Sequence, residues 1–150
     1  MQLFKEILVP VDFSESSARA LRLAIRLART TNARLSLLHV GLVPGYAGYD
    51  LGGYGAPYPE TLVALHEQLA REQKHAVEKL AAEEIPGDVA WRPVLREGWP
   101  PDEIVAEAKE SHADLIVMGT HGRTGLGRVL LGSVAERVVA KAGVPVMLER

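Results

Sequence analysis

Five short apolar runs alternate with four longer segments of helical periodicity, and this order limits the possible folds more than any other feature of the chain. The runs are rich in Val, Ile and Leu and lack polar alternation, which is typical of strands buried on both faces of a sheet. They predict strands near residues 5–11, 34–40, 88–95, 114–119 and 144–149, with helices near 14–31, 61–84, 100–111 and 133–142. Such an alternation predicts an α/β fold.

Length and composition predict one domain spanning residues 1–150, because 150 residues with 47% apolar side chains can bury a sizeable core. The absence of cysteine excludes disulfides and thiol catalysis and suits an intracellular protein. The first residues lack the pattern of an export signal. Gly41, Pro44 and Gly45 interrupt the longest uncharged stretch before 18 apolar residues accumulate. We therefore expect a soluble cytoplasmic protein with no membrane partner.

The charge balance argues against a nucleic-acid partner. The formal net charge is -2, whereas proteins that bind phosphate backbones usually carry a strongly basic face. One basic stripe does occur, since Arg19, Arg22, Arg26 and Arg29 follow each other at spacings of three and four residues. We interpret the stripe as the solvated outer face of the first helix.

A glycine-rich loop after the fourth apolar run is the strongest functional signal. It has Gly119 and Gly122, then nine residues, then Gly132 and Ser133, and a helical segment follows. Glycines let the backbone approach a ligand closely, and the free N–H groups at the start of a helix attract anions. The loop lacks the Gly-Lys-Ser/Thr ending of a Walker A motif and the GxGxxG dinucleotide fingerprint. The spacing nevertheless predicts a phosphate site.

The full spacing resembles the ATP-binding motif of the universal stress protein superfamily. The similarity extends to Ile7–Ser14, which looks like the family's opening strand and turn, to Asp114–Arg123 and to Val144–Met147, while residues 41–100 match only loosely. The resemblance implies a five-stranded parallel sheet in the order 3-2-1-4-5 with helices on both faces. It also implies an adenine nucleotide, ATP with or without Mg²⁺, bound where the chain reverses direction between strands 1 and 4. Ligands of open α/β sheets occupy such switch points.

Roles follow residue by residue from the resemblance, as hypotheses. Asp12, with the backbone of Pro10 and Val11, would hold the adenosine moiety, while Val40 and Met118 would supply apolar contacts to the base. The phosphates would be wrapped by the backbone of Gly119, Thr120, His121, Gly122 and Arg123, and bound at the helix start by Gly132, Ser133, Val134 and Ala135. Arg123 or Arg128 would neutralise their charge.

Several of these residues have a purely structural alternative. Asp12 could cap the helix that begins near Ser14, and Ser133 is a good N-cap in any protein. His121 could act as a base, or it could only shape the loop or bind a phosphate. No metal-ligand spacing and no GxSxG elbow occurs, so no catalytic residue is assigned.

The sequence thus predicts an ATP-binding regulatory or stress-response protein with at most slow ATP hydrolysis. The alternatives are an AMP-forming or nucleotidyl-transferring enzyme of the same fold and a structural dimer partner whose loop binds nothing.

The resemblance also implies a homodimer that pairs through the last strand, Val144–Glu149, an edge strand with alternating apolar residues. Residues 41–60, rich in Gly, Pro and Tyr, would form either a lid or partner-binding loop or a flexible excursion.

Overall fold

A computed structural model describes residues 3–41, 60–121 and 131–150. Within these ranges strands and helices alternate along the chain, as the apolar runs predicted. The elements are β1 (Glu6–Pro10), α1 (Glu15–Thr31), β2 (Arg34–Gly41), α2 (Glu60–Glu84), β3 (Trp91–Glu97), α3 (Pro100–Glu110), β4 (Leu115–Gly119), α4 (Ser133–Lys141) and β5 (Val146–Glu149). The Gly- and Tyr-rich segment lies outside the described residues, apart from Gly41 and Glu60.

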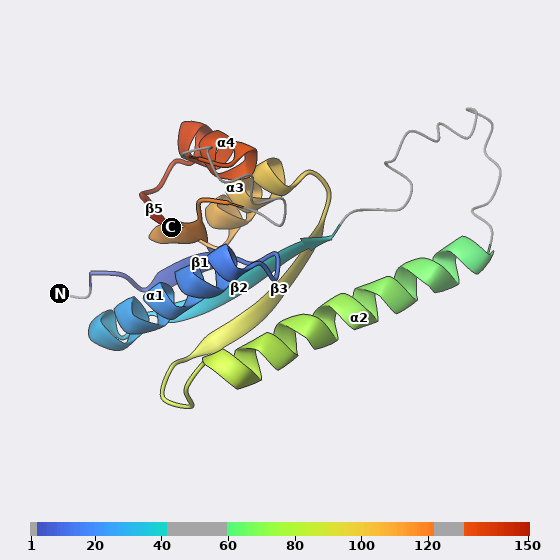
Figure 1. The fold of residues 1–150 in the computed structure, drawn as a ribbon, viewed down its shortest axis with the longest axis horizontal. Coiled ribbons are helices and arrows are strands. Elements are labelled where there is room, and N and C mark those ends of the chain that lie inside the picture. The colour runs from blue at the N-terminus through green and yellow to red at the C-terminus, as the bar shows by residue number, and fades with distance from the viewer. Residues whose placement is uncertain (1–2, 42–59, 122–130) are drawn as a thin grey trace.

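The strands form one parallel sheet in the order β3-β2-β1-β4-β5 (Figure 1). The chain builds the sheet outward from β1 to β3 on one side and then returns to add β4 and β5 on the other. The reversal therefore falls between β1 and β4, where Ile7 pairs with Leu115 and Leu8 with Ile116. The predicted fold class and strand order are confirmed.

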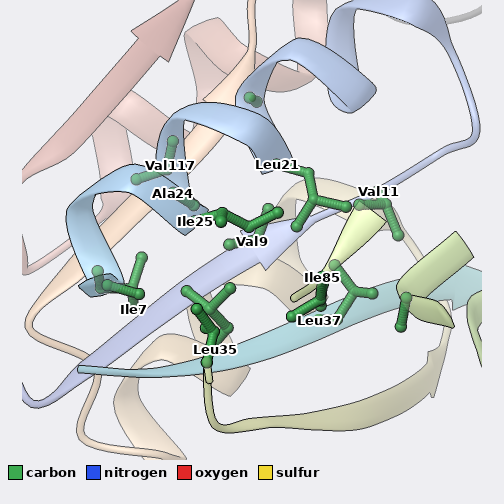
Figure 2. Close-up of a cluster of buried hydrophobic side chains, with 14 of the residues drawn as sticks. Ile7, Val9, Val11, Leu21, Ala24, Ile25, Leu35, Leu37, Ile85 and Val117 are labelled. Carbon is green, nitrogen blue, oxygen red and sulfur yellow. The ribbon is translucent and has the colours of Figure 1, made fainter. Parts of the chain in front are cut away.

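The sheet is buried on both faces, which explains the unbroken apolar runs. On one face Ile7, Val9, Leu35 and Leu37 pack with side chains of α1 and the end of α2 (Figure 2). On the other face Leu8, Leu38 and Ile116 pack with residues of α3 and α4, among them Ile104 and Val138. Because neighbouring residues of a strand point to opposite faces, the central strands β1 and β4 are buried almost throughout, whereas the edge strands β3 and β5 are only half-buried.

Two strand boundaries differ from the prediction. Strand β3 begins at Trp91 instead of near residue 88, because the chain first turns at Pro86, whose carbonyl accepts a hydrogen bond from Val89 N at 3.0 Å. Strand β5 begins at Val146 and not at Val144, although Pro145 contributes its carbonyl to Ile116 N at 3.0 Å. Pro145 lacks an N–H donor and stands inside the second shift, whereas Pro86 precedes the first and accepts the hydrogen bond that forms the turn.

The basic stripe of α1 lies on an exposed face as expected, since Arg22, Arg26 and Arg29 are all exposed. Arg22 also forms two hydrogen bonds to Glu84 at the end of α2, and Arg29 forms two to Asp88 in the turn that follows α2. These bonds hold the pKa values of Glu84 and Asp88 below their ordinary range. Part of the stripe is therefore a contact between elements and not simply a solvated face.

Among the described helices, none is both long and apolar enough to cross a membrane.

Candidate functional site

A cavity of about 780 Å³ opens beyond the carboxyl ends of β1, β2 and β4, at the switch point of the sheet. Every predicted site residue that the structure describes lines it: Pro10, Val11, Asp12, Val40, Met118, Gly119, Thr120, His121, Gly132, Ser133, Val134 and Ala135. Gly122, Arg123 and Arg128 lie outside the described residues. Residues more than a hundred positions apart in the chain are thus brought to one cavity, as the strand order requires.

Two of the motif's glycines permit close packing of the cavity wall. A Cβ atom on Gly119 would lie 2.3 Å from Ser16 Oγ and 2.8 Å from the Ser16 carbonyl carbon, so only glycine lets α1 approach the end of β4. A Cβ atom on Gly132 would lie 2.7 Å from the Thr120 carbonyl oxygen, which accepts a hydrogen bond from Gly132 N at 2.6 Å. The glycines therefore hold the starts of α1 and α4 against the end of β4.

The residues after β4 are fixed by neighbouring elements. Thr120 is buried and donates its backbone N–H to the Glu149 carbonyl of β5 at 3.0 Å. Its hydroxyl lies 2.8 Å from Nδ1 of His121, and the His121 N–H donates to Ser16 Oγ at 3.4 Å. His121 thus lines the cavity with one ring nitrogen already engaged.

Helix α4 starts at the cavity, and its cap differs from the expectation. Gly132 is the N-cap, with φ -70° and ψ 156°, and no side chain caps the helix. Ser133 is the first helical residue, so it is not the N-cap. The backbone N–H groups of Ser133, Val134 and Ala135 belong to the first turn, where no carbonyl of the same helix can accept them. Such a turn carries partial positive charge and suits an anion.

Asp12 lies two residues beyond the end of β1, where the chain turns into α1. Its Oδ1 atom accepts a hydrogen bond from Ser14 N at 3.0 Å, while the Ser14 hydroxyl caps the helix by accepting from Ser17 N at 3.1 Å. Asp12 therefore braces the turn but is not the helix cap. The carboxylate also lines the cavity, where it is an acceptor for hydroxyl or amino donors.

The sequence reasoning missed an aromatic pair beside Asp12. Phe13 has φ 63°, a left-handed conformation that is uncommon for a bulky residue. Its ring lies 4.8 Å from the ring of His39, which is buried and held by a contact of 2.9 Å between Nδ1 and the Val11 carbonyl. Both residues line the cavity. A positive φ at phenylalanine leaves no signal in the sequence.

The sequence also did not predict the wall of the cavity that α2 and α3 form. Helix α2 contributes Leu69, Glu72, Gln73 and Ala76, and α3 contributes Pro100 and Ile104. The helical periodicity of residues 61–84 predicts a helix but does not show which side chains of it reach the sheet's edge. The remaining lining residues, Ser17, Leu38 and Gly41, follow or precede the predicted ones along the chain.

The two ends of the cavity differ in electrostatic potential. The start of α4 supplies positive potential beside β4, whereas the carboxylates of Asp12 and Glu72 lie toward β1 and α2. In the described ranges no group of three or more His, Cys, Asp or Glu side chains could hold a metal ion. The cavity can thus accept an anion at one end and hydrogen-bond donors at the other.

Comparison with known proteins agrees with this architecture. Residues 3–150 match the model of the universal stress protein family. Universal stress protein MJ0531 of Methanocaldococcus jannaschii is 38% identical over 97% of this chain and 82% of its own length. The solved structure of MJ0577, from the same organism, is 31% identical, covers 98% of this chain and 96% of its own, and has a TM-score of 0.81.

One further solved structure carries a ligand. It is the universal stress protein from Archaeoglobus fulgidus in complex with dAMP, which is 27% identical and has a TM-score of 0.62. The alignment covers 99% of this chain and 99% of that one. A relative with the same fold therefore binds an adenine nucleotide. With the glycine loop at the switch point, the strand order and a family match along almost its whole length, this chain belongs to the universal stress protein family.

Proposed function

We propose that this protein binds ATP in the switch-point cavity and acts as a nucleotide-dependent regulatory or stress-response module. The observation that carries the proposal is the start of α4, where three residues of the first turn line the same cavity as Asp12 and Val40. A nucleotide matches this arrangement, because its phosphates suit the helix start and its ribose hydroxyls can donate to a carboxylate.

The strand order supports a single orientation for the ligand. Strand β1 lies between β4 and β2, and neighbouring strands are about 4.8 Å apart. Phosphates at Gly119–His121 and the start of α4 would therefore place the ribose beside Asp12 and the base beside Val40. Met118 is buried in the same cavity and adds apolar surface. The A. fulgidus relative with dAMP supports adenine as the base.

Hydrolysis would be slow at most. Attack on a γ-phosphate needs a positioned water and charge neutralisation, usually with Mg²⁺. His121 is a titratable side chain that lines the cavity in the proposed phosphate region, and its Nδ1 atom is engaged by Thr120. If Mg²⁺ accompanies ATP, the phosphate oxygens would supply most of its ligands.

We also propose that two copies pair through β5. In the described sheet β5 lies at the edge and is paired only with β4, so its other side can form backbone hydrogen bonds. Met147 of β5 is a large exposed apolar residue on this edge strand, and Val139 of α4, the helix before it, is exposed as well. Pairing would cover them.

The test of nucleotide binding is calorimetric titration with ATP, ADP, AMP and adenosine, with and without Mg²⁺, of the wild type and of Ser133→Pro. Proline at the first helical position fits the extended backbone of Gly132 and keeps the helix, but it removes one N–H and one hydroxyl from the cavity. The loss of one hydrogen bond to a charged phosphate should lower ATP affinity about tenfold or more.

Two controls define the outcome. Ser133→Ala keeps the backbone N–H and should lose less affinity, and adenosine, which lacks phosphates, should bind all the variants equally. Absence of ATP binding by the wild type would refute the proposal. Equal loss of ATP and adenosine affinity in Ser133→Pro would refute the assignment of phosphates to α4.

A further inference from the structure

The end of β2 is shaped to receive a side chain of α2. A Cβ atom on Gly41 would lie 2.5 Å from Oε1 and 2.7 Å from Nε2 of Gln73, so the missing side chain makes the room that the Gln73 carboxamide occupies. The Gly41 carbonyl accepts a hydrogen bond from Gly98 N at 3.1 Å, which ties this point of β2 to the residue after β3. The carboxamide thus rests against a fixed piece of backbone.

The Gln73 carboxamide is placed to bind something that the described chain does not supply. The side chain is half-buried and lines the cavity, yet it forms no hydrogen bond within the described residues. The neighbouring Glu72 differs, because its Oε1 atom accepts a hydrogen bond from Gln68 at 2.9 Å. No buried side-chain nitrogen or oxygen of the described residues lacks a hydrogen-bond partner, so the unpaired atoms of the carboxamide are open to the cavity that they line. They offer a ligand there an amide donor and a carbonyl acceptor.

The position of Gln73 along the cavity indicates its partner. In the proposed orientation the phosphates lie at β4, the ribose at β1 and the base at β2. Gly41 follows Val40 at the end of β2, so Gln73 is at the base end, farthest from the start of α4. This step rests on the proposed binding of a nucleotide.

We propose that Gln73 reads the hydrogen-bonding edge of the nucleobase. Adenine presents an amino donor next to a ring-nitrogen acceptor, and a carboxamide meets both at once by accepting with Oε1 and donating with Nε2. Gly41 is then a positioning residue, because it leaves the space in which the carboxamide lies. Val40 and Met118 contact the faces of the base, whereas Gln73 binds its edge.

The variant Gln73→Glu tests this role, because it should change the preference of the protein for ATP over GTP. The carboxylate can only accept, so it loses the bond to the ring nitrogen of adenine and repels that atom. Guanine offers two adjacent donors, its ring N–H and its amino group, which a carboxylate can accept together. Gln73→Glu should therefore shift the ratio of ATP to GTP affinity toward GTP by about thirtyfold or more, the range of one bidentate contact to a base.

The matched control is Gln68→Glu, which makes the same chemical change on the same helix at a residue outside the cavity lining. It removes the hydrogen bond from Gln68 to Glu72, which affects the binding of ATP and GTP alike, so it should leave the ratio of affinities within about twofold. Gln73→Ala should lower ATP affinity about tenfold. Thermal unfolding of each variant shows that the fold is kept.

Gly41→Ala tests the positioning role. Its new Cβ atom collides only with the far end of the flexible Gln73 side chain, so the fold should tolerate the change while the carboxamide moves away. ATP affinity should fall in the wild-type background, and no further fall should occur in the Gln73→Ala background.

The possible results separate this inference from the proposal on which it rests. If the wild type binds no nucleotide, both fail. If the wild type binds ATP but Gln73→Glu changes the ATP to GTP ratio no more than Gln68→Glu does, the reading of the base by Gln73 is wrong and nucleotide binding stands.

Discussion

At the scale of single residues, Gly119 shows that a glycine in a ligand motif can have a packing role. The Ser16 backbone occupies the place of a Cβ atom at position 119, so the residue is dictated by the approach of α1 to β4. The same approach directs Ser16 Oγ to the His121 N–H. Packing and loop geometry therefore depend on one absent side chain.

Gly119→Ala should consequently destabilise the protein by about 2 kcal/mol, since overpacking against a backbone atom is not relieved by a rotamer change. The free energy of unfolding in urea measures this. Gly87→Ala is the control, because a Cβ atom there meets nothing within 4 Å. Equal stability of the two variants would contradict the packing role of Gly119.

Sequence patterns and the family resemblance together predicted those cavity-lining residues that are local in the chain. The loop residues Gly119–His121 and Gly132–Ala135 lie in one continuous motif, and Asp12 lies in the turn directly after the first strand. The N-cap was misplaced by one residue, from Gly132 to Ser133, because serine is the stronger N-cap by residue type alone.

Residues that reach the site through packing could not be predicted. Gln73 depends on how far α2 extends past the sheet and on the space beside Gly41. Phe13 depends on a left-handed backbone that its residue type disfavours. Neither property is encoded in a local periodicity.

At the scale of elements, Asp114 joins the start of β4 to the start of β1. Its Oδ2 atom accepts hydrogen bonds from Lys5 N at 2.7 Å and Glu6 N at 2.9 Å, and its own N–H donates to the Glu6 carbonyl at 2.9 Å. The backbone bonds hold the pKa of the carboxyl below its ordinary value of 3.8. Because the folded state prefers the charged form, the stabilisation is present above the unfolded-state pKa and is lost as the pH falls through the folded-state pKa.

Asp114→Asn should cost about 1 kcal/mol at neutral pH, as two charge-assisted hydrogen bonds become neutral ones. The stability difference between wild type and variant should be constant above about pH 5 and should shrink below the ordinary carboxyl pKa of 3.8. Urea unfolding over a pH series measures it. The exposed Glu67, changed to Gln, should show little difference at any pH. If the stability difference between the wild type and Asp114→Asn stays constant in acid, protonation of the Asp114 carboxyl is not coupled to stability.

At the scale of the whole molecule, the strand order decides both the cavity and the free edge. Parallel strands whose order reverses between β1 and β4 must leave a crevice there, and the same order leaves β5 at an edge. The alternation of elements predicted the α/β class, whereas the order 3-2-1-4-5 was implied only by the family resemblance. Periodicity does not state which strands are neighbours.

The proposed pairing through β5 predicts a particle of about twice 16.3 kDa by light scattering. Met147→Lys should shift the protein toward monomer, since a lysine on an edge strand opposes strand pairing. Val63→Lys is the control, because Val63 is an exposed apolar residue of α2, far from β5 along the sheet order. A monomeric wild type would refute the pairing.

Nucleotide binding at the switch point is tested most directly by amide chemical shifts of the ¹⁵N-labelled protein during titration with ATP. Binding in the cavity should cause the largest shifts at the carboxyl ends of the strands and the start of α4, at Gly41, Thr120, His121, Val134 and Ala135. Amides at the opposite end of the sheet, at Ala33, Asp88 and Asp114 before the amino ends of β2, β3 and β4, should hardly move. If saturating ATP causes no shifts at the cavity amides, or causes shifts centred on Ala33, Asp88 and Asp114, ATP does not bind at the switch point.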